Sequence, residues 1–282
     1  MSTSAPAIKT RATPQKGRVT QFRGRLTQAG VFRSEWTKLY SLRSTRYALL
    51  ATAVMTIGFG IIASAVTVSR WASMSAADKA SFDPLNTSLL GVRFGVLAIG
   101  VLGVLLIAGE YSTGMVRSTM TAVPKRLPVL WGKTGVYALV ALVITVPAAL
   151  IAFFAGQAIL SGQNIQIAFS HAGVPGAVLG AAGYLTLVGL FAMGLGAVMR
   201  NTAAGIATFA GIMFVVPPLI SILPSSIANS IDPYLPSNAG EAMMRIGHQA
   251  NTLSPAAGFA VFAGYVVVVI AAAAVLLVRR DV

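Results

Sequence analysis

Residues 109–133, GEYSTGMVRSTMTAVPKRLPVLWGK, form a polar and basic stretch between two long apolar runs. Each of these runs has about the 20 residues that a helix needs to cross a bilayer. The stretch is therefore predicted to be a loop between two membrane helices. It is the longest polar segment between membrane helices on the side that carries the charge, so we expect a soluble partner to bind here.

The composition of the whole chain agrees with this prediction. Of the 282 residues, 56% are hydrophobic and only 10% are charged, whereas about 25% of an ordinary soluble domain is charged. The chain is thus predicted to be an all-α polytopic membrane protein. It contains no cysteine, which excludes disulfides, thiol catalysis and cysteine–metal sites.

Six apolar runs are long enough to span a membrane. The predicted spans are 47–69, 89–108, 134–160, 174–199, 203–223 and 257–278. They make residues 47–282 one six-helix transmembrane domain, in which residues 224–256 form a long outer loop. Pro147 is expected to kink the third span, and Pro217-Pro218 to break or bend the fifth. In the fourth span, the spacing Gly176-x-x-x-Gly180 predicts close helix packing.

The first 46 residues divide into a tail and a helix. Residues 1–27 are polar and basic with almost no apolar periodicity, which predicts a disordered cytoplasmic tail. Residues 28–46 have helical periodicity, with an apolar half that includes Trp36 and Leu39 and a basic, polar half that includes Lys38. This pattern predicts an amphipathic helix that lies in the membrane interface.

Two charged residues interrupt this pattern, because Glu35 and Arg43 both project from the apolar half of the helix. One interpretation is a lipid-surface anchor in which the two side chains snorkel toward water. The other is that the two charges pair with a protein surface packed against the helix. The sequence leaves both interpretations open.

Six spans place both termini on one side, and the basic residues indicate which side this is. With the termini in the cytoplasm, 17 of the 21 Lys and Arg residues but only three of the seven acidic residues lie inside. The inner side then carries the whole net charge of +14. We interpret this charge as a sign of topology and of contact with an anionic inner leaflet, and we expect no nucleic-acid binding.

Motifs for catalysis, metal binding and nucleotide binding are missing. Gly132-Lys133-Thr134 resembles the end of a phosphate-binding loop, but Leu127 occupies the position where that motif requires a glycine. The two histidines, His171 and His248, have no metal-ligand spacing between them. We therefore expect no enzymatic activity, no metal and no cofactor in this chain.

Ionisable side chains at membrane depth are the usual sign of ion-coupled transport, and the centres of the predicted spans contain none. Arg93 lies about a turn inside the outer end of the second span, and Glu110 lies at the inner end. Arg93 is expected either to snorkel to the outer interface or to line a substrate path or a subunit contact. Without a buried carboxylate, any energy for transport is expected to come from outside the chain.

Two segments, EWTKLYSLRSTRYALL (35–50) and residues 109–133, together resemble the membrane permease subunits of ABC exporters of the type-2 class. The likeness is greatest to permeases of high-GC Gram-positive bacteria, and YLPSNAGEAMM (234–244) also fits that group. The resemblance implies two permeases, identical or different, that assemble with two separate ATP-binding subunits. It also implies a location in the cytoplasmic membrane of a bacterium, with both termini inside.

The resemblance further implies roles for three groups of residues. A connecting helix at the membrane surface would include Glu35, Trp36, Lys38, Leu39 and Arg43. A short coupling helix would dock on the ATP-binding subunit through residues among Glu110, Tyr111, Ser112, Thr113, Gly114, Arg117, Pro124, Lys125 and Arg126. The outer gate or substrate path would include Arg93, Pro217, Pro218, Asn238, Gly240 and Glu241.

The expected function is therefore the export of an amphipathic or hydrophobic molecule, such as a drug, a peptide antibiotic or a lipid. Two alternatives stay open: a membrane scaffold or immunity protein that moves nothing, and a secondary transporter. An ATPase subunit that co-purifies favours the exporter, and the absence of such a partner favours the scaffold. Dependence on a proton or sodium gradient favours the secondary transporter.

Overall fold

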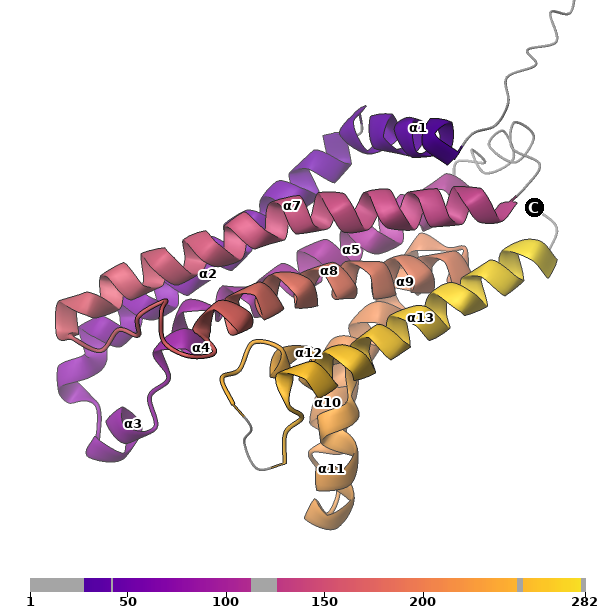
Figure 1. The fold of residues 1–282 in the computed structure, drawn as a ribbon. Helices are drawn as coiled ribbons and strands as arrows, with labels where there is room; N and C mark the ends of the chain where they lie inside the picture. Colours follow the sequence, from indigo (N-terminus) through magenta and orange to yellow (C-terminus); the bar gives the residue numbers. More distant parts are fainter. Residues whose placement is uncertain (1–27, 42, 113–125, 248–250, 280–282) are drawn as a thin grey trace, which may run out of the picture.

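The computed structural model describes residues 28–41, 43–112, 126–247 and 251–279, and helices are the regular secondary structure in these ranges. Six helical runs are long and apolar enough to cross a membrane. They lie together in one elongated bundle (Figure 1). The predicted all-α polytopic fold is thus confirmed, while the predicted tail 1–27 lies outside the described residues.

The six runs follow one another in chain order. They are α2 (Arg43–Arg70), α5 (Gly91–Ser112), α7 (Arg126–Leu160), α8 (Val174–Met199), a composite of α9 (Thr202–Ala210), η3 (Gly211–Val215) and α10 (Val216–Ile220), and α13 (Pro255–Arg279). Helix α1 (Gln28–Ser41) precedes them. Shorter helices connect them: η1 (Trp71–Ser73), α3 (Ala76–Ala80), α4 (Pro84–Ser88), η2 (Ser161–Gln163), α11 (Ser225–Ile231), η4 (Asp232–Tyr234) and α12 (Pro236–Ala242).

The polar stretch 109–133 is helical at both of its described ends, where the sequence predicts a loop. Helix α5 continues to Ser112, and α7 already begins at Arg126. Hydropathy marks the part of a helix that lies in lipid, whereas the hydrogen-bonded helix can continue into the polar interface. Residues 113–125 lie outside the described residues.

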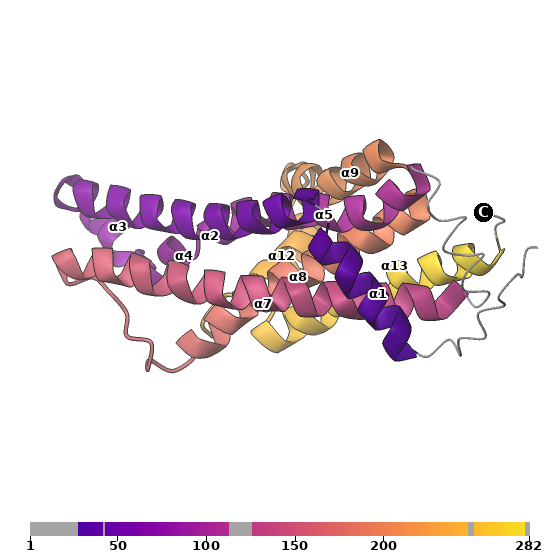
Figure 2. The same cartoon turned by 90° about the horizontal axis from the view of Figure 1, so that it is seen from above.

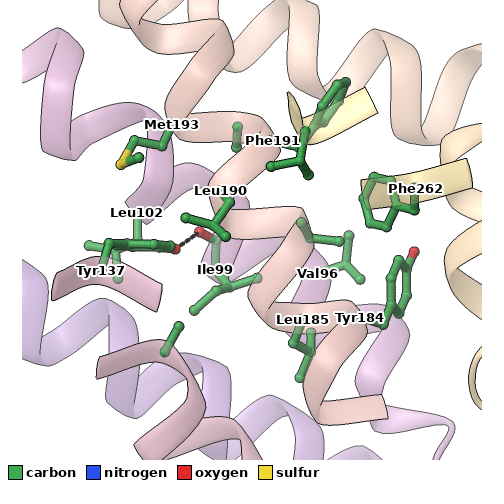
Figure 3. Packing of buried hydrophobic residues seen from close by; sticks show 14 of the residues in the cluster. Val96, Ile99, Leu102, Tyr137, Tyr184, Leu185, Leu190, Phe191, Met193 and Phe262 are labelled. Carbon is green, nitrogen blue, oxygen red and sulfur yellow. Dashed lines mark hydrogen bonds between the residues drawn. The ribbon is translucent and has the colours of Figure 1, made fainter. Parts of the chain in front are cut away.

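Helix α8 is the centre of the bundle. It packs against α5, α7, α9 and α13, and 78% of its most apolar window is buried, compared with 17% for the α9–α10 run. Figure 3 shows this core, where the Tyr137 hydroxyl of α7 donates a 3.0 Å hydrogen bond to the Ile99 carbonyl of α5. The helices at the periphery of the bundle therefore keep apolar faces that can meet lipid or another chain.

Helix α1 crosses α7 at the end of the bundle where α7 begins and α13 ends (Figures 1 and 2). Its described part ends at Ser41, α2 is described from Arg43, and the two helices run in different directions (Figure 2). Residues 43–46 of the predicted helix 28–46 belong to the described start of α2. The apolar segment that follows Tyr47 therefore extends its helix backwards through Arg43. Helices α3 and α4 lie at the opposite end of the bundle.

The prolines act differently in the two spans. Helix α7 passes through Pro147 as one helix. In the fifth span, the π-helical segment η3 ends two residues before Pro217. Because proline lacks the N–H that an α-helix would bond to the carbonyl four residues earlier, the wider turn accommodates the missing bond. The predicted break at Pro217-Pro218 thus begins one turn earlier in the chain.

The predicted outer loop 224–256 is largely helical. Helix α12 returns toward the bundle and packs against α13 and α8. Its Gly240 lies so close to the ring of Tyr184 that an added Cβ would overlap the ring atoms. The sequence therefore places a glycine where α12 must pack closely on the central helix.

Candidate functional site

We call the end of the bundle where α1 crosses α7, which is predicted to be cytoplasmic, the inner end, and the opposite end the outer end. The inner end contains a cluster of three charged side chains from three helices. The Nζ atom of Lys133 (α7) lies 2.8 Å from a carboxylate oxygen of Glu35 (α1) and 2.8 Å from one of Glu110 (α5). The side chains of Lys133, Glu35 and Glu110 are 5%, 2% and 18% exposed. One ammonium group therefore links α1 to the two helices that flank residues 113–125.

The surroundings of each residue explain why this inner cluster forms. On α1, Phe32 precedes Glu35 by almost one turn, and its ring lies 3.8 Å from the position of a Cβ added at Gly135. Phe32 of α1 thus packs over α7 at Gly135, close to the level of Lys133. Glu110 lies near the end of the described part of α5. The ammonium group of Lys133 gives its carboxylate a cation.

The inner cluster decides between the two interpretations of Glu35. Glu35 pairs with a protein surface, and this surface is α7 of the same chain. Arg43 is exposed at the start of α2, and Trp36 of the predicted apolar face is also exposed. For Lys38 and Leu39 the structure describes only the backbone, which belongs to α1.

The residues assigned to the coupling segment are only partly described. Glu110, Tyr111 and Ser112 form the last turn of α5, and Arg126 begins α7 with its side chain outside the described part. The remaining candidates are Thr113, Gly114, Arg117, Pro124 and Lys125, which all lie outside the described residues. The structure therefore describes the two ends of this segment.

Arg200, which follows the fourth predicted span, adds a second connection at the inner end. Its guanidinium carbon lies 5.1 Å from the ring centroid of Tyr111, and its Nη2 donates a 3.1 Å hydrogen bond to the Leu276 carbonyl. Arg200 ends α8 in the left-handed conformation, with φ of 52°. It thereby joins the inner ends of α5, α8 and α13.

At the outer end, Arg93 of α5 pairs with Glu241 of α12. Its Nη2 donates a 2.9 Å hydrogen bond to the carboxylate, and the guanidinium of Arg245 lies 3.8 Å from the same oxygen. The side chains of Arg93 and Glu241 are 46% and 21% exposed. Asn238, in the same helix, donates a hydrogen bond to the Asp232 carbonyl. The structure thus brings together Arg93 and Glu241, while Asn238 shares the helix of Glu241 and bonds to Asp232. Pro217 and Pro218 lie on α10, a separate element.

A wide apolar groove of about 890 Å³ follows α2 and α5 and reaches the fifth span at Phe214. Its lining includes Phe59 and Phe94, whose rings stack with centroids 3.8 Å apart. Arg93 is the charged residue of the described lining. The groove can therefore hold apolar material, and its charged residue is the Arg93 that pairs with Glu241.

Within the described ranges, no group of three or more His, Asp and Glu side chains is arranged to hold a metal ion. The sequence matches no protein-family model and no curated protein. The candidate site is therefore defined by its own geometry: an inner charged cluster, an apolar groove, and an ion pair at the outer end.

Proposed function

We propose that this chain is the membrane permease subunit of an ATP-driven exporter of the ABC type-2 class, powered by a separate ATP-binding subunit. The resemblance of residues 35–50 and 109–133 to that class supports the proposal. The observation that carries it is the ion-pair cluster of Glu35, Lys133 and Glu110. The protein would work in the cytoplasmic membrane of a bacterium, with both termini inside.

The inner cluster supports coupling because it ties helices α1, α5 and α7 together next to residues 113–125, where the ATP-binding subunit would dock. Residues 113–125 join the end of α5 to the start of α7, and Glu110 and Lys133 hold these two ends together. Glu35 adds α1 to the same unit. A partner that pulls on the segment between them would move α1, α5 and α7 together, as in a rigid-body transition between two packings.

The apolar groove supports an amphipathic or hydrophobic cargo. Its volume of about 890 Å³ lies in the range of small-molecule sites, roughly 300–1,000 Å³. Helix α2 and the α9–α10 run, which border it, bury only 22% and 17% of their apolar windows. A second permease copy would cover this face and enclose the groove. The Arg93–Glu241 pair would then lie at its outer exit.

The test is purification of the full-length, tagged chain in mild detergent, followed by an assay of the eluate for ATPase activity and for a subunit with a phosphate-binding loop. We expect the wild type to carry such a subunit. The double variant Arg117→Glu/Lys125→Glu should retain about tenfold less of it, a loss of ~1.4 kcal/mol. The matched control Arg70→Glu reverses an exposed charge at the opposite end of α2 and should retain it fully.

Two outcomes would contradict the proposal. A wild-type chain that comes out alone and without ATPase activity would identify a scaffold or immunity protein. Transport that collapses when the proton or sodium gradient is dissipated, with ATP present, would identify a secondary transporter. The buried carboxylate of Glu35 is the observation that favours a secondary transporter, because such carriers use ionisable groups shielded from water.

A further inference from the structure

A second groove lies on another side of α2, between α2 and α7 and next to α1. It has a volume of about 440 Å³. Its apolar walls come from two facing helices, with Leu49, Leu50 and Ala53 on α2 and Val140, Val143 and Ile144 on α7. Leu50 and Val143 are more than half exposed. The groove is therefore open along its side to the surrounding hydrocarbon rather than enclosed in the bundle.

One end of this α2–α7 groove is chemically different from the rest. There the lining consists of Arg46, Thr45 and the indole of Trp36. Arg46 belongs to the first turn of α2 and Trp36 to α1, so this end lies on the side of the bundle where α1 crosses. Tryptophan side chains are enriched at the level of lipid headgroups. The groove thus runs from a cationic end near Trp36 to an aliphatic end farther along α2 and α7.

The described residues provide no counter-ion at the cationic end of the groove. Among the residues that the structure describes, no carboxylate lies within ion-pair distance of Arg46. The first turn of α2 holds no acidic residue, and the exposed Arg43 lies one turn before Arg46. An anion at this end would therefore meet the guanidinium group of Arg46 beside the indole of Trp36.

We propose that the α2–α7 groove binds one anionic phospholipid of the inner leaflet. The phosphate would bind Arg46 beside Trp36, and one acyl chain would lie along Leu49, Ala53 and Val140. Charge complementarity favours this occupant over a second copy of the chain, because the chain carries a net charge of +14 and another copy would bring like charge to Arg46. The site is separate from the cargo groove and does not depend on an ATP-binding partner.

The test is native mass spectrometry of the full-length chain after delipidation, with titration of phosphatidylglycerol or phosphatidylcholine that carry the same acyl chains. We expect the wild type to retain one phosphatidylglycerol molecule about fivefold more strongly than phosphatidylcholine, since one basic residue at an anionic surface contributes ~1 kcal/mol. Arg46→Gln should abolish this preference. Arg70→Gln, an exposed arginine at the other end of the same helix, should retain it.

A second variant tests the acyl-chain part of the site. Ala53→Phe places a ring in the apolar channel and should lower the retention of both lipids, whereas Arg46→Gln affects only the anionic one. The thermal unfolding temperature in detergent shows whether each variant is folded. An unchanged lipid preference in Arg46→Gln would overturn the proposal. So would an Ala53→Phe variant that keeps its lipid but loses a dimer peak, because a second copy would then occupy the groove.

Discussion

The ammonium group of Lys133 lies 2.8 Å from the carboxylate of Glu35, and both side chains are almost entirely shielded from solvent. The two residues are far apart in the sequence and belong to α7 and α1. The attraction between buried charges is offset by the cost of removing both from water, so a buried ion pair is weak evidence of stability. Loss of one partner is costly, however, because the other charge stays buried. A variant that removes one partner of the inner cluster should therefore lose a measurable amount of stability.

The first prediction is that Lys133→Met destabilises the protein by ~3–5 kcal/mol, because the carboxylates of Glu35 and Glu110 lose their shared cation. The measurement is thermal or denaturant unfolding of the purified chain in one detergent. The matched control is Lys79→Met, a lysine on α3 at the opposite end of the bundle. Its Nζ atom lies 5.6 Å from the ring centroid of Trp71, and loss of this cation–π contact should change stability by no more than about 1 kcal/mol. Equal shifts in both variants would show that the inner cluster contributes nothing specific.

The two acidic residues of the inner cluster should differ in their effect. Glu35→Gln removes a charge that is 2% exposed, and we expect a loss of about 1–3 kcal/mol. Glu110→Gln removes a charge that is 18% exposed and therefore keeps more contact with water than Glu35, so its loss should stay below about 1 kcal/mol. Unfolding measurements on the two variants give this order directly. The reverse order would mean that Glu110, not Glu35, is the main partner of Lys133.

Much of the fold could be predicted from hydropathy, because lipid requires long apolar helices. The span 174–199 coincides with α8, and the other spans were placed within a few residues except where polar sequence continues a helix. The start of α7 differs from the prediction because RLPVLWGK (126–133) has the polarity of a loop, although these residues form the first turns of a helix. Hydropathy indicates whether a segment prefers lipid or water, and it does not report whether the backbone of that segment is hydrogen-bonded as a helix.

The site was harder to predict than the fold. The helical periodicity identifies Glu35 as a charge on the apolar half of its helix. Its partner Lys133 stands out in the sequence only as part of an incomplete phosphate-binding motif. The pair depends on the crossing of α1 over α7, and a single sequence does not contain that geometry. A signal was nevertheless present, since a misplaced acid on an interfacial helix requires a cation, and Lys133 borders the apolar part of the third span.

The glycines of α8 offer a matched pair for the next prediction. An added Cβ at Gly180 would overlap the Met243 carbonyl, whereas one at Gly176 would have open space around it. The predicted close packing therefore holds at Gly180 and fails at Gly176. Gly180→Ala should destabilise by about 1–3 kcal/mol through overpacking. Gly176→Ala should stabilise by up to about 1 kcal/mol through helix propensity. Unfolding midpoints that move in the same direction would contradict this packing.

The last prediction concerns the outer ion pair. Because the Arg93 side chain is 46% exposed, its pair with Glu241 should contribute no more than about 1 kcal/mol, and less in high salt. Arg93→Glu should lower the unfolding temperature in low salt, since it places two carboxylates together. The exchange Arg93→Glu/Glu241→Arg should restore the unfolding temperature if the pairing itself holds α12 to α5.

Arg245 also lies near Glu241, so Arg245→Gln serves as the control for its share of the attraction. An exchange variant as unstable as Arg93→Glu would show that the two positions do not interact, and that α12 is held by its packing on α8 and α13 alone.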